Sequence, residues 1–107
     1  MTFAVEYNPE FFNDLVQAVD WYNDRQIGLG TRFFNKVRKQ TKKLSTSALH
    51  YSVRYDDVRC MLIEKFPYLV HYRVNKQTLT VKVEALFHTS RDPEIWYERT
   101  MSSSGRG

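Results

Sequence analysis

Two apolar runs separated by a short polar turn place the strongest constraint on how this chain of 107 residues can fold. Residues 66–74 and 79–87 alternate apolar and polar side chains over most of their length, a pattern typical of half-buried β-strands. Residues 75–78 lie between them and are short and polar enough to form a hairpin turn. The sequence therefore predicts a β-hairpin whose second strand runs out into His88 and Arg91.

The segments before the hairpin are expected to cover one of its faces. Residues 2–7 alternate as a short strand. Asn8-Pro9-Glu10 is a helix start, because it combines a capping side chain, a proline at the first helical position and an acid in the first turn. Apolar residues then recur every three or four positions until a glycine-containing turn at residues 28–30, which predicts one amphipathic helix.

A second, basic helix is expected over residues 31–44. Its cations outnumber its acids by six to none: Arg32, Lys36, Arg38, Lys39, Lys42 and Lys43. Its predicted buried side is Phe33, Phe34, Val37, Thr41 and Leu44. Residues 45–52 are small and polar and predict a linker, and residues 58–66 predict a strand. We expect Val58, Cys60 and Leu62 to share one face of that strand, with Cys60 in the core, and Arg59, Met61 and Ile63 to share the other.

The order of elements predicts an α+β domain of the type βααβββ, over residues 1–100. The last three strands are expected to form an antiparallel sheet, since their connections are too short for crossovers. The two-helix hairpin would back one face and leave the other open. The polar side chains expected on the open face are Arg59, His71, Arg73, Lys82, Glu84 and His88. Residues 93–99 predict a short terminal helix capped by Asp92, and residues 101–107 a disordered tail.

The net charge of +4 conceals an uneven distribution. Residues 1–30 hold five acids and one base, a net charge of −4, whereas residues 31–107 hold fifteen bases and seven acids, a net charge of +8. This division suggests a basic surface for an anionic partner. A single cysteine excludes an intrachain disulfide, and three scattered histidines do not suggest a metal site. Without a signal peptide or a long apolar segment, we expect a cytoplasmic protein with no metal, cofactor or membrane partner.

The stretch from Phe66-Pro67-Tyr68 through the turn to His88-Thr89-Ser90-Arg91-Asp92-Pro93 resembles the C-terminal half of the RelE/ParE superfamily of bacterial toxins. The βααβββ order fits that superfamily over residues 2–99. The resemblance implies the toxin half of a type II toxin–antitoxin pair. A cognate antitoxin protein would then neutralise this chain, and operator DNA would be bound only through the antitoxin.

Two activities occur in this superfamily. RelE-like members cut mRNA on the ribosome without a metal, and ParE-like members inhibit DNA gyrase. RelE-like nucleases typically carry an arginine where this chain has Tyr68, an arginine just after the last strand, and a tyrosine six residues later. Arg91 and Tyr97 match the last two features. Because loss of a positioned cation would cost such a site a few kcal/mol of transition-state stabilisation, the resemblance is nearer to the ParE-like branch, and an enzymatic activity is not favoured.

The sequence is thus compatible with three functions. A ParE-like gyrase inhibitor would use a partner-binding surface of Arg59, Arg73, Lys82, His88, Arg91, Lys36, Lys39 and Lys43. A RelE-like mRNA interferase would use His88, Arg91, Tyr97 and Arg73 as catalytic residues, with Glu84 or Glu64 as an alternative base. A protein with the toxin fold but without toxicity would only bind its partner.

Overall fold

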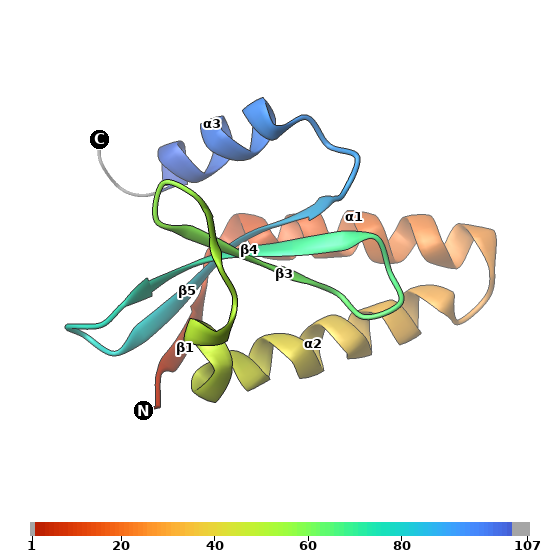
Figure 1. Cartoon of the computed structure of the whole chain (residues 1–107). Coiled ribbons are helices and arrows are strands. Elements are labelled where there is room, and N and C mark those ends of the chain that lie inside the picture. Colours follow the sequence, from red (N-terminus) through yellow and green to blue (C-terminus); the bar gives the residue numbers. More distant parts are fainter. Residues whose placement is uncertain (1, 104–107) are drawn as a thin grey trace.

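The computed structural model describes residues 2–103, which form a five-stranded sheet with helices on both faces (Figure 1). The elements, in order, are β1 (Ala4–Tyr7), α1 (Pro9–Arg25), α2 (Leu29–Ser47), a single 3-10 turn η1 (Ala48–His50), β2 (Val53–Tyr55), β3 (Val58–Leu62), β4 (Tyr68–Asn75), β5 (Thr80–His88) and α3 (Pro93–Ser103). The predicted α+β class and the order of its main elements are confirmed.

The strands lie in the order β1-β5-β4-β3-β2. β3 to β5 form the predicted antiparallel meander, and β2 extends it by one antiparallel strand. β1 pairs in parallel with β5, so the complete sheet is mixed. The parallel pairing is possible because the long helical hairpin returns the chain between β1 and the later strands. The prediction missed β2, a strand of only three residues at the sheet edge.

The two helices of the hairpin meet closely at Gly30. A Cβ atom at this position would lie 2.2 Å from the carbonyl oxygen of Val19, and the Gly30 N–H donates to Asn23 Oδ1 at 2.7 Å. Gly28 turns the chain with a φ of 85°, which glycine adopts without strain. At the start of α1, Asn8 caps the helix through a 3.0 Å bond from the Glu10 N–H, as predicted.

The predicted linker over residues 45–52 is wrong for most of its length, because α2 continues to Ser47 and η1 follows directly. Leu44 and Ala48, one helical turn apart, are both fully buried, so the apolar stripe continues past the predicted helix end. Phe34 is 40% exposed and lies outside the buried side to which it was assigned.

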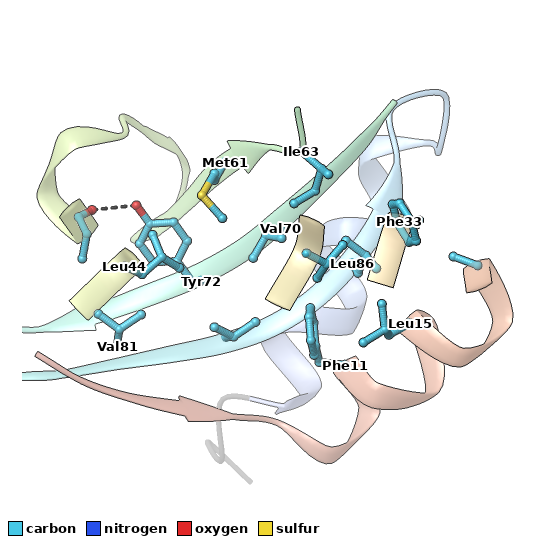
Figure 2. Close-up of a cluster of buried hydrophobic side chains, with 14 of the residues drawn as sticks. Phe11, Leu15, Phe33, Leu44, Met61, Ile63, Val70, Tyr72, Val81 and Leu86 are labelled. Carbon is cyan, nitrogen blue, oxygen red and sulfur yellow. Dashed lines mark hydrogen bonds between the residues drawn. The ribbon is translucent and has the colours of Figure 1, made fainter. Parts of the chain in front are cut away.

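The core lies between the helical hairpin and one face of the sheet. Figure 2 shows Phe11 and Leu15 of α1 and Phe33 of α2 beside side chains of the central strands. Tyr72 anchors one end of the core, since its buried hydroxyl donates to the Ala48 carbonyl at 2.6 Å (Figure 2). On β3 the two faces are reversed relative to the prediction. Met61 and Ile63 enter this core, whereas Cys60 is buried on the opposite face, against His71.

A β-bulge in β5 changes which side chains face the core. His71 is opposite Ala85 and Tyr72 is opposite Val83, so Glu84 is an extra residue in β5. Val83 lies in the core before the bulge and Leu86 after it. Strict alternation along β5 would put Leu86 on the face of Glu84 and Phe87 on the face of Val83, and the bulge reverses both placements.

The sheet face opposite the hairpin is not open, because α3 covers part of it. Trp96 of α3 packs against His71 with ring centroids 4.9 Å apart, and His71 is fully buried. Arg99 of α3 also pairs with Asp14 of α1, at 2.7 Å. The helix extends to Ser103, past its predicted end. Residues 101–103, predicted to begin the disordered tail, are thus helical, and residues 104–107 lie outside the described part of the chain.

Candidate functional site

The residues predicted for the functional site lie in separate places. His88 and Arg91 do come together, at a cleft of about 350 Å³ between α1 and the end of β5. We call this the β5-end cleft; its other lining side chains include Asp14, Trp21, Tyr68 and Ser90. His88 Nδ1 accepts the Ser90 N–H at 3.0 Å. A neutral His88 therefore carries its proton on Nε2.

Asp14 is not a free base in the β5-end cleft. Its carboxylate accepts two bonds from the Arg99 guanidinium, at 2.7 and 3.1 Å. It also accepts the backbone N–H of Leu86 at 3.0 Å. With both oxygens engaged by donors, Asp14 acts as a structural link between α1, β5 and α3.

Arg73 lies at the other end of the β4–β5 hairpin from the β5-end cleft. Tyr68 is the residue opposite His88, whereas Arg73 is opposite Lys82. The Arg73 guanidinium is already engaged, at 2.8 Å from Asp57, 3.0 Å from Glu84 and 3.2 Å from the Thr100 carbonyl. The catalytic set predicted for a nuclease is therefore not assembled around Arg73.

Arg73, Arg59 and Lys82 do share a hollow of about 570 Å³ beside the hairpin turn. Within it, Arg59 donates to the Tyr51 carbonyl at 2.6 Å. Glu84 is buried and bound to both Arg73 and Asn8. Of the three predicted cations, Lys82 is the one whose side chain is exposed.

A buried polar cluster centred on His71 lies beneath α3. His71 Nδ1 is 2.9 Å from the Tyr55 hydroxyl and 3.4 Å from Cys60 Sγ. Burial lowers the pKa of His71 to about 3 and raises the pKa of Cys60 to about 11. At neutral pH the cluster therefore contains an uncharged imidazole and a thiol, not the ion pair of a nucleophilic Cys–His site.

Tyr97 lies on α3, half exposed, beside a hollow of about 530 Å³ that Arg54, Tyr55 and Trp96 also line. Its ring centroid is 6.4 Å from that of Tyr55. Tyr97 matches a nuclease residue by sequence spacing alone. In the structure it lies on this hollow, next to aromatic side chains.

The predicted lysines of α2 lie along one side of that helix with a fourth cation. Arg32, Lys36, Lys39 and Lys43 are spaced by four, three and four residues, and we call them the α2 basic stripe. Arg32, Lys36 and Lys39 line a hollow of about 540 Å³ together with Lys65 and Phe66. The sequence prediction missed Lys65 and Phe66, because they follow β3 and approach α2 only through the packing of the sheet on the hairpin.

Residues 2–103 contain no cluster of three or more His, Cys, Asp or Glu side chains that could hold a metal ion. Over the same residues, no helix combines the length and the apolar character needed to cross a membrane.

The fold is shared with solved toxin structures. They include the chromosomal ParDE toxin–antitoxin system from P. aeruginosa, with a TM-score of 0.73 and 15% identity over 83% of this chain and 98% of that chain. An arginine-to-alanine double variant of the E. coli toxin RelE in the free state has a TM-score of 0.68 and 13% identity over 95% and 98% of the two chains. The RelBE2 toxin–antitoxin complex from Mycobacterium tuberculosis has a TM-score of 0.61 and 17% identity over 82% and 99%.

At these identities the structural similarity shows the fold alone. No curated protein matches the sequence. The sequence profile of the ParE toxins of type II toxin–antitoxin systems, however, matches residues 5–93, which span β1 to the start of α3. This chain therefore belongs to the family of ParE toxins of type II toxin–antitoxin systems.

Proposed function

We propose that this toxin acts in the cytoplasm by binding and inhibiting DNA gyrase, without catalysis, and that a cognate antitoxin neutralises it. The observation that carries the proposal is the placement of Arg73. It lies at the far end of the hairpin from His88 and Arg91, and its guanidinium is engaged by Asp57 and Glu84.

Metal-free RNA cleavage through the 2′-hydroxyl needs a base, an acid and a cation within hydrogen-bond reach of one phosphate. In the β5-end cleft, His88 and Arg91 could supply one proton-transfer group and one cation. The proposed bases are elsewhere, since Glu84 is buried against Arg73 and Glu64 pairs with Lys36 at 3.0 Å. Binding of a protein partner by these charged side chains does not require them to surround a single phosphate.

The antitoxin is supported by family membership and by the solved structures of similar fold. The ParDE structure is of a toxin–antitoxin system, and the RelBE2 structure is of a toxin–antitoxin complex. The positive net charge of this chain favours an acidic partner.

The test uses the purified toxin with gyrase and relaxed plasmid. We expect the toxin to inhibit supercoiling and to accumulate cleaved DNA bound to gyrase, with no cleavage of mRNA on translating ribosomes. Cleavage of mRNA that is lost in both His88→Ala and Arg91→Ala would replace the proposal with a RelE-like interferase. A toxin that affects neither gyrase nor mRNA, but still binds its antitoxin, would be a non-toxic member of the fold.

A further inference from the structure

The α2 basic stripe is a linear array of cations on a single rigid element. Over the eleven residue steps from Arg32 to Lys43 an α-helix rises about 16 Å, and the four cations of the stripe recur every three or four residues. No acidic residue occurs in α2, and within the described part of the chain Lys36 is the only member of the stripe in a salt bridge. Arg32, Lys39 and Lys43 are exposed, so their charges are available to a partner.

The stripe borders a hollow with an apolar floor. Leu29 and Phe66 line the hollow together with the cations, and both are partly buried against the core. The Phe66 ring is held by Phe33, with centroids 4.9 Å apart, and by Tyr22, with centroids 5.2 Å apart. Lys65 adds a further cation at the rim. The floor is therefore preformed, which lowers the entropic cost of filling it.

This combination favours a protein segment over nucleic acid. Duplex DNA would use the cations through its phosphates but would leave the apolar floor unfilled. A helical segment with carboxylates three and four residues apart and one aliphatic side chain would use both features.

We propose that the α2 basic stripe and its hollow form a docking site for an acidic amphipathic segment of the antitoxin, with one aliphatic side chain seated on Leu29 and Phe66. This inference rests on the antitoxin part of the proposed function, and it concerns a surface separate from the β5-end cleft.

The first test measures binding of a fluorescent synthetic peptide that carries glutamates at helical spacing and one leucine. We expect saturable binding that weakens as salt is raised. Replacing the leucine with serine should weaken binding about fivefold, as expected for loss of a partly buried aliphatic group. The double variant Arg32→Glu/Lys39→Glu should weaken it about tenfold or more.

The matched control is Arg38→Glu/Lys76→Glu, which changes the net charge equally. Arg38 is exposed on another side of α2, and Lys76 is exposed in the β4–β5 turn. The control should bind the peptide within about twofold of the unmodified toxin. Equal losses in both double variants, or a peptide that binds as well with serine as with leucine, would reduce the site to a general polyanion surface and overturn the proposal. Tighter binding of duplex DNA than of the peptide would do the same.

The second test uses the purified cognate antitoxin. The Arg32→Glu/Lys39→Glu toxin should bind this antitoxin about tenfold more weakly than the unmodified toxin does, whereas the control variant should bind it normally. If the stripe variant loses gyrase inhibition while its antitoxin binding is unchanged, the stripe belongs to the gyrase interface. In that case this inference fails and the proposed function stands. If the peptide binds as expected but the unmodified toxin leaves gyrase active, the gyrase proposal fails and this one stands.

Discussion

The buried His71 should make the stability of the toxin begin to fall at a pH well above the range in which carboxylates titrate. His71 is fully buried, and desolvation, aided by the charges of Arg54 and Arg99, lowers its pKa to about 3. An unfolded histidine has a pKa near 6.5. As the pH falls through about 6.5, the unfolded chain therefore binds a proton that the folded chain refuses, and the folded state loses stability until the pH approaches 3.

The magnitude follows from the two pKa values of His71. Between them, each pH unit lowers the free energy of unfolding by about 1.4 kcal/mol. From pH 7 to pH 5 the loss from His71 alone is about 2 kcal/mol, because little of it occurs above pH 6.5. This is a substantial share of the stability of a domain of this size.

Urea denaturation of the toxin and of His71→Gln at pH 7, 6 and 5 isolates this contribution, since all other groups titrate in both proteins. The variant should be less stable at pH 7, because it disturbs the contacts with Tyr55 and Cys60. Its deficit should shrink by about 2 kcal/mol at pH 5. A deficit that does not change with pH, or imidazole ¹⁵N shifts showing that His71 becomes protonated near pH 6.5 in the folded protein, would refute the reasoning.

Four further substitutions test the turn and the packing that hold the helices to the sheet. Gly30→Ala should lower the free energy of unfolding by about 3 kcal/mol in urea titrations, since its Cβ would lie 2.2 Å from the Val19 carbonyl oxygen, whereas Gly28→Ala should cost about 1 kcal/mol through its positive φ. Tyr72→Phe should cost about 1–3 kcal/mol by the same measurement, because it leaves the buried Ala48 carbonyl without its donor. Arg99→Leu should cost about 2 kcal/mol and speed hydrogen exchange in α3 more than in β4, because it removes the bond to Asp14. Equal protection of α3 in both proteins would contradict that role of Arg99.

Local signals in the sequence were sufficient for most of the fold. The cap at Asn8 and the hairpin turn after β4 depend on residues close together in the chain, and both were predicted. The end of α2 was mispredicted because serine and threonine after Leu44 suggested a linker. The sequence signal for a longer helix is the apolar Ala48, four residues after Leu44, and the structure shows Ala48 buried.

The candidate site was predictable only where its members are neighbours in sequence. His88 and Arg91 come together because they are only three positions apart in the chain. α3 instead covers the sheet face through contacts between residues far apart in sequence, such as Arg99 with Asp14, 85 residues away, and no local pattern encodes them. Strand alternation alone therefore predicts an open polar face, although its central member His71 is buried.

The bulge at Glu84 links the error in the fold to the error in the site. Strict alternation assigns Glu84 and Leu86 to the same face of β5, but the extra residue returns Leu86 to the core and turns Phe87 toward His71.

The same bulge accompanies burial of Glu84, which pairs with Arg73 and accepts a hydrogen bond from the Asn8 side chain. Asn8 also caps α1, and Arg73 bonds to the Thr100 carbonyl of α3. Arg73, the arginine of the sheet in the predicted nuclease site, is therefore part of the junction of β5, α1 and α3. Releasing Arg73 for catalysis would leave Glu84 as a buried charge without its partner, which costs several kcal/mol. The structural role of Arg73 and a catalytic role for it are thus in direct competition, and the observed contacts satisfy the structural one.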